Sequence, residues 1–265
     1  STYDTADYAV ASIATTCDAS LTYGTMPAST ALHNLADGDY KICVKLWNTS
    51  NPPVYAASPI FKLKKSLPDF TSLALASEAS DGFVNLAERS SSNELVSNLA
   101  GLSFDSASYK LVTASTTCDN QLTYGLAPND LGSDGSYKVC VKLTDLAGNP
   151  AEFGESPAIV LKTIQPAFTS LGLTGDASDT YINAAERNNS TPLVGNAVGT
   201  AFDSAAYKLV AATSNCAQQT NFGSKPNAAA TEFTTDGDYK VCAKISDNAG
   251  NPPAFGSSPN ITLKV

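Results

Sequence analysis

The sequence has few of the residues on which most enzymes and metal sites depend. Its 265 residues contain a single histidine, His33, and its six cysteines form no Cys-x-x-Cys pair, which argues against a zinc site. It contains no His-Glu-x-x-His, no Gly-x-Ser-x-Gly and no glycine-rich phosphate loop. These absences exclude the commonest catalytic constellations, so we expect no enzymatic activity and no organic cofactor.

Long apolar runs and positive charge are scarce as well. No apolar run is long enough for a membrane-spanning helix, so we expect this segment not to span a membrane. The net charge is −9, whereas nucleic acids and anionic membrane surfaces attract a basic face, so we expect no nucleic-acid partner. Helical periodicity is also missing. Short alternating runs between glycines and prolines predict an all-β protein.

One phrase occurs three times along the chain. Residues 135–150 read Gly-Ser-Tyr-Lys-Val-Cys-Val-Lys-Leu-Thr followed by Asp-Leu-Ala-Gly-Asn-Pro. Residues 237–252 repeat this phrase with few changes, and residues 38–52 carry a shortened form. A period of about one hundred residues is too long for a solenoid unit, which runs roughly 20–50 residues. It fits a chain of separate small domains, each with its own core.

The repeats predict tandem β-sandwich domains arranged as an elongated, semi-rigid rod. The linkers 63–68 and 161–166 are short and end in proline, which limits flexing. The first copy lacks its first third, two strands' worth, so upstream strands or another chain would complete it, or it is a reduced domain. We expect a fragment of a longer array. The predicted domains are 1–66 (truncated, with its first strands missing), 67–164 and 165–265.

The six cysteines fall two to each repeat, at equivalent places. Pairs that recur with the repeat predict one disulfide within each domain, and disulfides predict an oxidising compartment: the extracellular space, the cell surface or the periplasm. Each would close a loop of roughly 22–26 residues, worth on the order of 3 kcal/mol. The predicted pairs are Cys17 with Cys43, Cys118 with Cys140, and Cys216 with Cys242.

Alternation within the phrase predicts which face of its strand is buried. Tyr239, Val241 and Ile245 fall on one face, while Cys242 falls on the other between two lysines. The apolar face should form the core. We therefore expect each disulfide on the outer surface of a sheet, joining neighbouring strands or a strand and a loop, and not between the two sheets.

Three motifs resemble those of the bacterial immunoglobulin-like (Ig-like) domains strung in tandem in cell-surface adhesins and other secreted proteins. They are the Asp-x-x-Ile/Val-Asn-x-Ala-Glu segments at 81–88 and 179–186, the Asp-Gly-x-Tyr entry to the repeated strand, and the Asp-x-Ala-Gly-Asn turn after it. The resemblance covers nearly all of the second and third repeats and the back two-thirds of the first. It implies Ig-like β-sandwiches, although paired cysteines at these places are not a general trait of the family.

The resemblance also suggests calcium, which stiffens domain joints in some such adhesins. Calcium requires six to eight oxygen ligands, and no dense run of aspartates is present. The alternative is a turn aspartate, a strand-end asparagine and a surface glutamate in each repeat. The candidate ligands are Asp81, Asn85 and Glu88 in the second repeat, and Asp179, Asn183 and Glu186 in the third.

Two functions remain open. The first is a non-enzymatic stalk or spacer of a bacterial surface adhesin. The second is a binding module that grips a host or neighbouring-cell protein or glycan through its loops. The first repeat is then the expected binder, because it carries Trp47, Tyr55 and His33. Trp47 is also compatible with simple packing at a strand end. The second and third repeats differ mainly between their cysteines and gain no aromatic cluster there, which favours the spacer.

Overall fold

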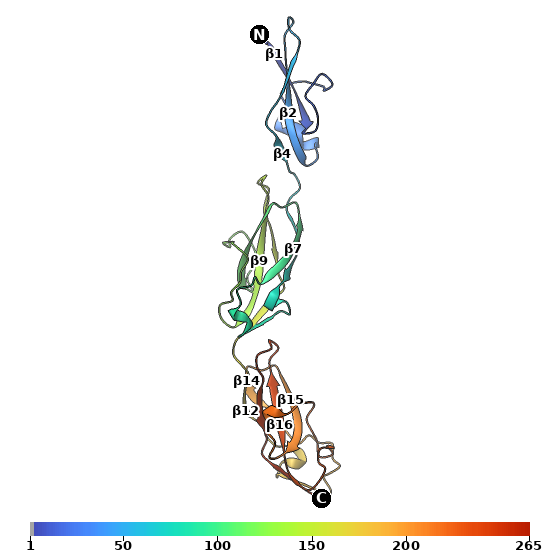
Figure 1. Ribbon diagram of the computed structural model, residues 1–265, viewed down its shortest axis with the longest axis vertical. Coiled ribbons are helices and arrows are strands. Elements are labelled where there is room, and N and C mark those ends of the chain that lie inside the picture. Colours follow the sequence, from blue (N-terminus) through green and yellow to red (C-terminus); the bar gives the residue numbers. More distant parts are fainter. Residues whose placement is uncertain (1–2) are drawn as a thin grey trace.

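The computed structural model describes residues 3–265, which form three β-sheet units (Figure 1). Figure 1 shows the units following one another along the longest axis, with the two chain termini at opposite ends. Among the described residues, strands pair only within each of the three predicted ranges. No described helix is long and apolar enough to cross a membrane. The domain boundaries and the stiffness of the rod stay predictions.

The first unit is one antiparallel sheet, in which β2 pairs with β1, β3 and β4. Alternating side chains make β2 a strand, and the Asn-Pro turn after it lets the next strand fold back and pair with it, as the repeated phrase predicts. Its elements are β1 (Thr5–Ser12), the 3₁₀ turn η1 (Ser29–Asn34), β2 (Gly38–Trp47), β3 (Val54–Ala57) and β4 (Phe61–Leu63).

The second unit is a sandwich of two sheets. β5 and β7 form a two-stranded sheet, and β9 is the centre of a five-stranded sheet in which β6 runs parallel to β11. The elements are β5 (Asp69–Leu75), η2 (Ser77–Ala79), β6 (Phe83–Asn85), η3 (Glu88–Ser90), β7 (Val96–Leu102), β8 (Ser106–Thr113), β9 (Gly135–Thr144), β10 (Glu152–Glu155) and β11 (Ile159–Lys162).

The third unit repeats this topology, with β12 and β14 opposite a five-stranded sheet centred on β16. Both complete units are therefore Ig-like β-sandwiches, as the resemblance implies. The elements are β12 (Ala167–Ser170), η4 (Gly175–Ala177), β13 (Tyr181–Asn183), β14 (Val198–Thr200), β15 (Ser204–Ala211), η5 (Cys216–Gln218), β16 (Gly237–Ser246), β17 (Ala254–Ser257) and β18 (Ile261–Lys264).

The core lies on the predicted face of the repeated strand. Val241, Ala243 and Ile245 are fully buried in the third unit, and the same face of β9 is buried in the second. Burial of three such side chains supplies several kcal/mol of hydrophobic stabilisation, at about 25 cal/mol per Å² of apolar surface. The alternation-based assignment of the core is confirmed.

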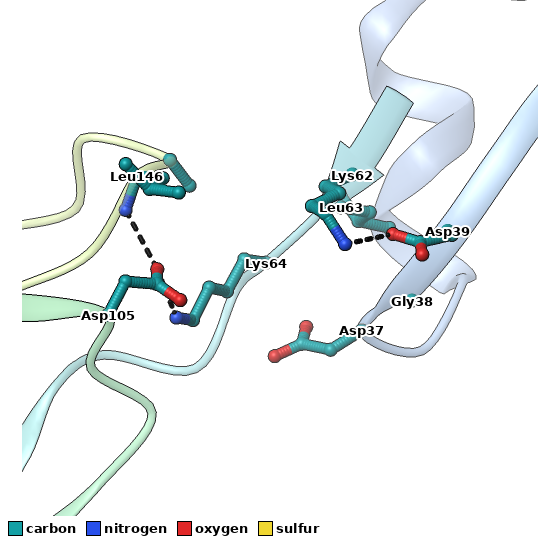
Figure 2. Close-up of a pocket in the computed structure, with 9 residues that line it drawn as sticks. Asp37, Gly38, Asp39, Lys62, Leu63, Lys64, Asp105 and Leu146 are labelled. Carbon is teal, nitrogen blue, oxygen red and sulfur yellow. Dashed lines mark hydrogen bonds and ion pairs between the residues drawn. The ribbon is translucent and has the colours of Figure 1, made fainter. Parts of the chain in front are cut away.

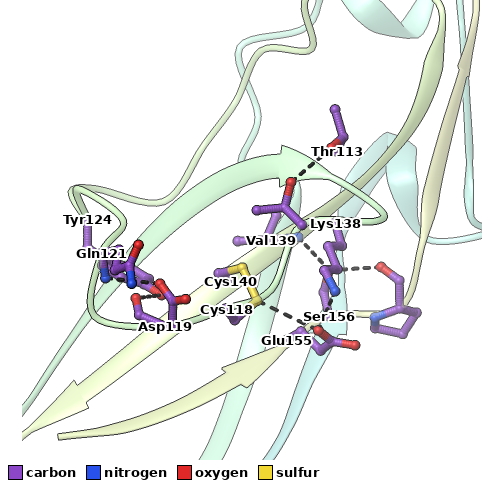
Figure 3. Close-up of a disulfide and its surroundings, with 12 residues drawn as sticks. Thr113, Cys118, Asp119, Gln121, Tyr124, Lys138, Val139, Cys140, Glu155 and Ser156 are labelled. Carbon is purple, nitrogen blue, oxygen red and sulfur yellow. Dashed lines mark hydrogen bonds and ion pairs between the residues drawn. A yellow bond between two sulfur atoms is a disulfide. The ribbon is translucent and has the colours of Figure 1, made fainter.

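All three predicted disulfides are present, and each joins a strand to the loop before it. They lie on the outer face of the sheet and not in the core between the sheets, as the alternation predicts, but the strand cysteines are covered and not exposed. Cys43, Cys140 and Cys242 are fully buried. The segment between the two cysteines folds back over the outer face of the sheet. Figure 3 shows the loop that carries Cys118 lying over β9, beside the ion pair of Lys138 and Glu155.

A second small cluster therefore covers the outer face. In the third unit Val210, Cys216 and Cys242 pack with Phe222 and Phe255. The two aromatic rings lie 5.8 Å apart, and corresponding pairs occur in the other units.

The first unit lacks more than two strands' worth of structure. The second unit contains three strands, β5, β6 and β7, before the point at which the first repeat begins to match it. Short strands such as β6, of three residues, carry too little alternation to be recognised from sequence. Among residues 3–66 only Ala11 and Cys43 are buried, so one face of this sheet has no core above it.

Candidate functional site at the joints between repeats

The same ion pair lies at both junctions between units. Lys64, just after β4, places its ammonium 2.7 Å from a carboxylate oxygen of Asp105 in the second unit. Lys162, at the end of β11, pairs with Asp203 of the third unit at 2.5 Å. Figure 2 shows the first of these pairs, with Asp105 also accepting a hydrogen bond from the backbone of Leu146.

The lysine backbone is held as well, by the asparagine of the Asp-x-Ala-Gly-Asn turn. The side-chain amide of Asn149 donates to the carbonyl of Lys64 at 3.1 Å. Its counterpart Asn251 donates to the carbonyl of Lys162 at 2.8 Å. An aspartate four residues earlier accepts from each asparagine, and the turn glycine has φ near +80°, a conformation that favours glycine. Each joint is therefore a clasp of one ion pair and one amide contact on the same lysine.

The linkers are tied back to the preceding unit. Asp37, which precedes β2, accepts hydrogen bonds from the backbone amides of Lys65 and Ser66. Asp134 accepts in the same way from Thr163 and Ile164. These contacts shorten the free part of each linker and limit its conformational freedom.

The second joint has contacts that the first lacks. Asn85, at the end of β6, donates its side-chain amide to the carbonyl of Ala249 at 2.9 Å, and the amide of Leu86 donates to Asn251 at 3.2 Å. Asp247, Ala249 and Asn251 are consequently buried. The corresponding turn of the first joint is exposed or half-buried, since the first repeat has no strand equivalent to β6.

A cavity of about 610 Å³ opens at the first joint (Figure 2). Four of its five charged side chains pair with one another: Lys62 pairs with Asp39 at 2.8 Å, and Lys64 pairs with Asp105. Hydrogen bonds from Lys64 and from the backbone of Leu146 hold the pKa of Asp105 below its ordinary value. Lys162 and the backbone of Asn248 lower the pKa of Asp203 in the same way. The joint carboxylates are therefore charged at neutral pH and matched to their donors.

The suggested calcium ligands form a local turn in each complete unit. Asp81 and Asp179 accept from the backbone amide two residues later. Glu88 accepts from the amide of Asn85, and Glu186 accepts from that of Asn183. Within residues 3–265, no three histidine, cysteine, aspartate or glutamate side chains lie close enough together to hold a metal. The turn accounts for the motif without an ion, and calcium stays a prediction.

The two suggested ligand-binding aromatics have packing partners. The indole nitrogen of Trp47 donates to Asp7 at 2.7 Å, and the ammonium of Lys45 lies 5.6 Å from the ring centroid. The ring of Tyr55 lies 5.7 Å from that of Tyr23, and it corresponds to Phe153 and Phe255 in the other units. Tyr55 therefore belongs to the aromatic pair that every unit contains. A ligand role for either residue stays a prediction.

Two sets of residues that make contacts in the structure were not identified from the sequence. The joint lysines and aspartates recur at equivalent places in the repeats, and that recurrence is the signal that could have found them. The arginines that follow Glu88 and Glu186 were also missed. Arg187 donates to the carbonyls of Ala228 and Phe233, at 2.8 and 2.7 Å, and Arg89 donates to that of Gly132. They fix the loop between the cysteines onto the turn.

No protein-family model and no curated protein matches the sequence. Structural neighbours include a 1.5-MDa bacterial ice-binding adhesin, 17% identical with a TM-score of 0.37, covering 99% of this chain and 87% of that one. A Ca²⁺-stabilised ice-binding adhesin of an Antarctic bacterium is 15% identical, with a TM-score of 0.30 and coverage of 85% and 57%. Protocadherin gammaB7 is 10% identical, with a TM-score of 0.31 and coverage of 98% and 66%. The chain thus spans less than two thirds of the last two structures.

Proposed function

We propose that this chain is a non-enzymatic spacer of a cell-surface adhesin, which holds another part of the protein away from the surface. The observation that carries the proposal is the repeated clasp, in which Lys64 and Lys162 are each held by an aspartate and an asparagine of the next unit. A chain that only needed separate binding domains would not require the same contacts at both junctions. Joints fixed in this way keep the repeats in an extended arrangement, so that the chain can act as a spacer.

The disulfides within the units support an extracellular or periplasmic location for the protein. Each cross-links a strand of the five-stranded or four-stranded sheet to the loop covering it, and such bonds persist in oxidising compartments. A spacer outside the cell also gains resistance to local unfolding from the loop closure.

Small-angle X-ray scattering of the whole chain tests the spacer. We expect a scattering profile of one extended particle, unchanged between about 0.15 and 0.5 M salt, because the clasp includes amide contacts that salt does not screen. The double variant D105N/D203N is expected to show a broader distribution of shapes. A wild-type profile typical of three freely jointed units would contradict the proposal.

A binding module is the second candidate, and the open sheet face of the first repeat is the observation that favours it. A glycan array and binding to host-cell surface proteins, with W47A and Y55A as variants, would test the loop-based version. Thermal melting in calcium and in EGTA tests the suggested ion, with D81N/D179N as the variant. Equal melting temperatures in both solutions would show that calcium does not stabilise the protein.

A further inference from the structure

The sheet of the first repeat has an apolar face that nothing in residues 3–66 covers. Ile42, Val44 and Leu46 on β2 are only half-buried. Their counterparts in the second repeat, Val139, Val141 and Leu143, have no exposed surface, and the same is true in the third repeat. On β4, Phe61 and Leu63 are half-buried where the counterparts on β11 and β18 are buried.

The two complete repeats show what covers this face. The two-stranded sheet β5–β7 lies over it in the second repeat, and Leu73 and Val96 of that sheet join the core cluster. β6 pairs in parallel with β11, the counterpart of β4. The edge of β4 has no such partner among the described residues. Both the face and the edge are therefore open in the first repeat.

One residue distinguishes the open face from the covered ones. Phe70 of β5 lies directly over Gly154 of β10, where a Cβ atom would come within 2.3 Å of the ring. Phe168 lies over Gly256 in the same way, at 2.0 Å. The corresponding residue of β3 is Ala56, which is exposed and pairs with Val44. A phenylalanine could not sit over Ala56 as it sits over either glycine.

We propose that the open face of the first repeat is the docking surface for a β-hairpin of the β5–β7 type, contributed by a partner protein. Its two strands would lie over Ile42, Val44 and Leu46, and a short third strand would pair with the edge of β4. The residue over Ala56 is smaller than phenylalanine. Hydrogen bonds along the edge would give affinity, and the alternate apolar side chains would give register.

The alanine makes the proposal specific, because it predicts which hairpins fit. The probes are two synthetic peptides of residues 67–104 of this chain, one with the native Phe70 and one with the substitution F70A. The whole chain is titrated with each peptide by calorimetry, and amide hydrogen exchange follows residues 38–47. We expect the F70A peptide to bind wild-type protein on the order of tenfold more tightly than the native peptide, because over-packing is relieved.

The variant A56G supplies the reciprocal test, with A57G on the neighbouring residue of β3 as the matched control for glycine in a strand. We expect the native peptide to bind A56G on the order of tenfold more tightly than wild type, while A57G leaves the preference unchanged. To guard against a peptide that does not fold, the same two hairpins are also fused to the N-terminus through a Gly-Ser linker. The F70A fusion should protect the amides of β2 more than the native fusion does.

Three results would overturn the proposal. The first is exchange in β2 that neither peptide and neither fusion slows. The second is equal binding of both peptides to wild type and to A56G, which would mean that the contact over Ala56 is not formed. The third is protection of β2 without peptide that rises with protein concentration, which would show that a second copy of the chain covers the face.

Discussion

Asn85 of the second repeat donates its side-chain amide to the backbone carbonyl of Ala249 in the third, across 2.9 Å. Residues 3–66 contain no strand equivalent to β6, so no described residue of the first repeat stands at the corresponding place. The two joints therefore share a clasp but differ in strength. The second has further hydrogen bonds and a buried turn, so we expect it to bend less than the first.

The substitution N85A is expected to loosen the second joint alone. It removes the bond to Ala249, worth about 1 kcal/mol net, and also the acceptor for the amides of Ala87 and Glu88 within its own turn. N183A removes the same turn acceptor in the third repeat, where no contact between described repeats depends on it. Single-molecule FRET between dyes on the second and third repeats should broaden for N85A and not for N183A. Equal broadening in both would mean that loss of a turn inside a repeat, and not loss of the contact with Ala249, broadens the distances.

The substitution N251A should lower the free energy of unfolding of its repeat more than N149A does, although the two residues occupy equivalent turns. Asn251 is 4% exposed and donates to both Lys162 and Asp247, so its removal leaves a buried carboxylate and a carbonyl without this donor. Such a loss costs about 1–3 kcal/mol. Asn149 is half-buried, and water can replace it. The free energy of unfolding of the third repeat in N251A, compared with that of the second in N149A, is measured by urea denaturation. Equal losses of unfolding free energy would show that the burial of Asn251 at the second joint does not increase its contribution to stability.

Acid should loosen both joints before it unfolds the repeats. The pKa values of Asp105 and Asp203 are lowered from the ordinary value of 3.8, first by the lysine of the preceding unit and then by a backbone amide. Their folded-state pKa lies below the unfolded one, so the stabilisation is complete above about pH 4 and is lost as the pH falls through the lowered pKa. FRET across each joint should therefore broaden below that pH.

Two controls accompany the acid titration. D105N/D203N should be broad already at neutral pH and should lose most of the response to acid. Amide protection of β9 and β16 should persist where FRET first changes, which separates loosened joints from unfolded repeats. Distances that stay constant down to the pH of global unfolding would show that the carboxylates contribute nothing to the joint.

The sequence predicts the fold better than the joints, for a physical reason. Alternation is a local property, so the strict period of Tyr239, Val241 and Ile245 identifies the core face without knowledge of the rest of the chain. The burial of Cys242 depends on where the loop after β15 folds, which alternation does not contain. The contact of Asn85 with Ala249 joins residues 164 positions apart. Asn85 and Asn183 occupy the same place in the same motif, yet among the described residues only Asn85 donates to a following repeat.

Reduction of the disulfides should unfold the first repeat selectively. Each disulfide closes a loop of 22 or 26 residues, which is worth about 3 kcal/mol in each repeat. The second and third repeats also have a core of fully buried side chains, whereas only Ala11 and Cys43 are buried among residues 3–66. The same loss is therefore a far larger share of the stability of the first repeat.

Amide hydrogen exchange in dithiothreitol measures this difference within one molecule. We expect β2 to lose its protection, while β9 and β16 keep theirs. The variant C118S/C140S is the matched control, since it should lower the melting temperature of the second repeat but leave it folded. If β2 stays protected after reduction, its sheet has stabilising contacts beyond the disulfide. The open face would then be covered in solution, and addition of the F70A hairpin should slow its exchange no further.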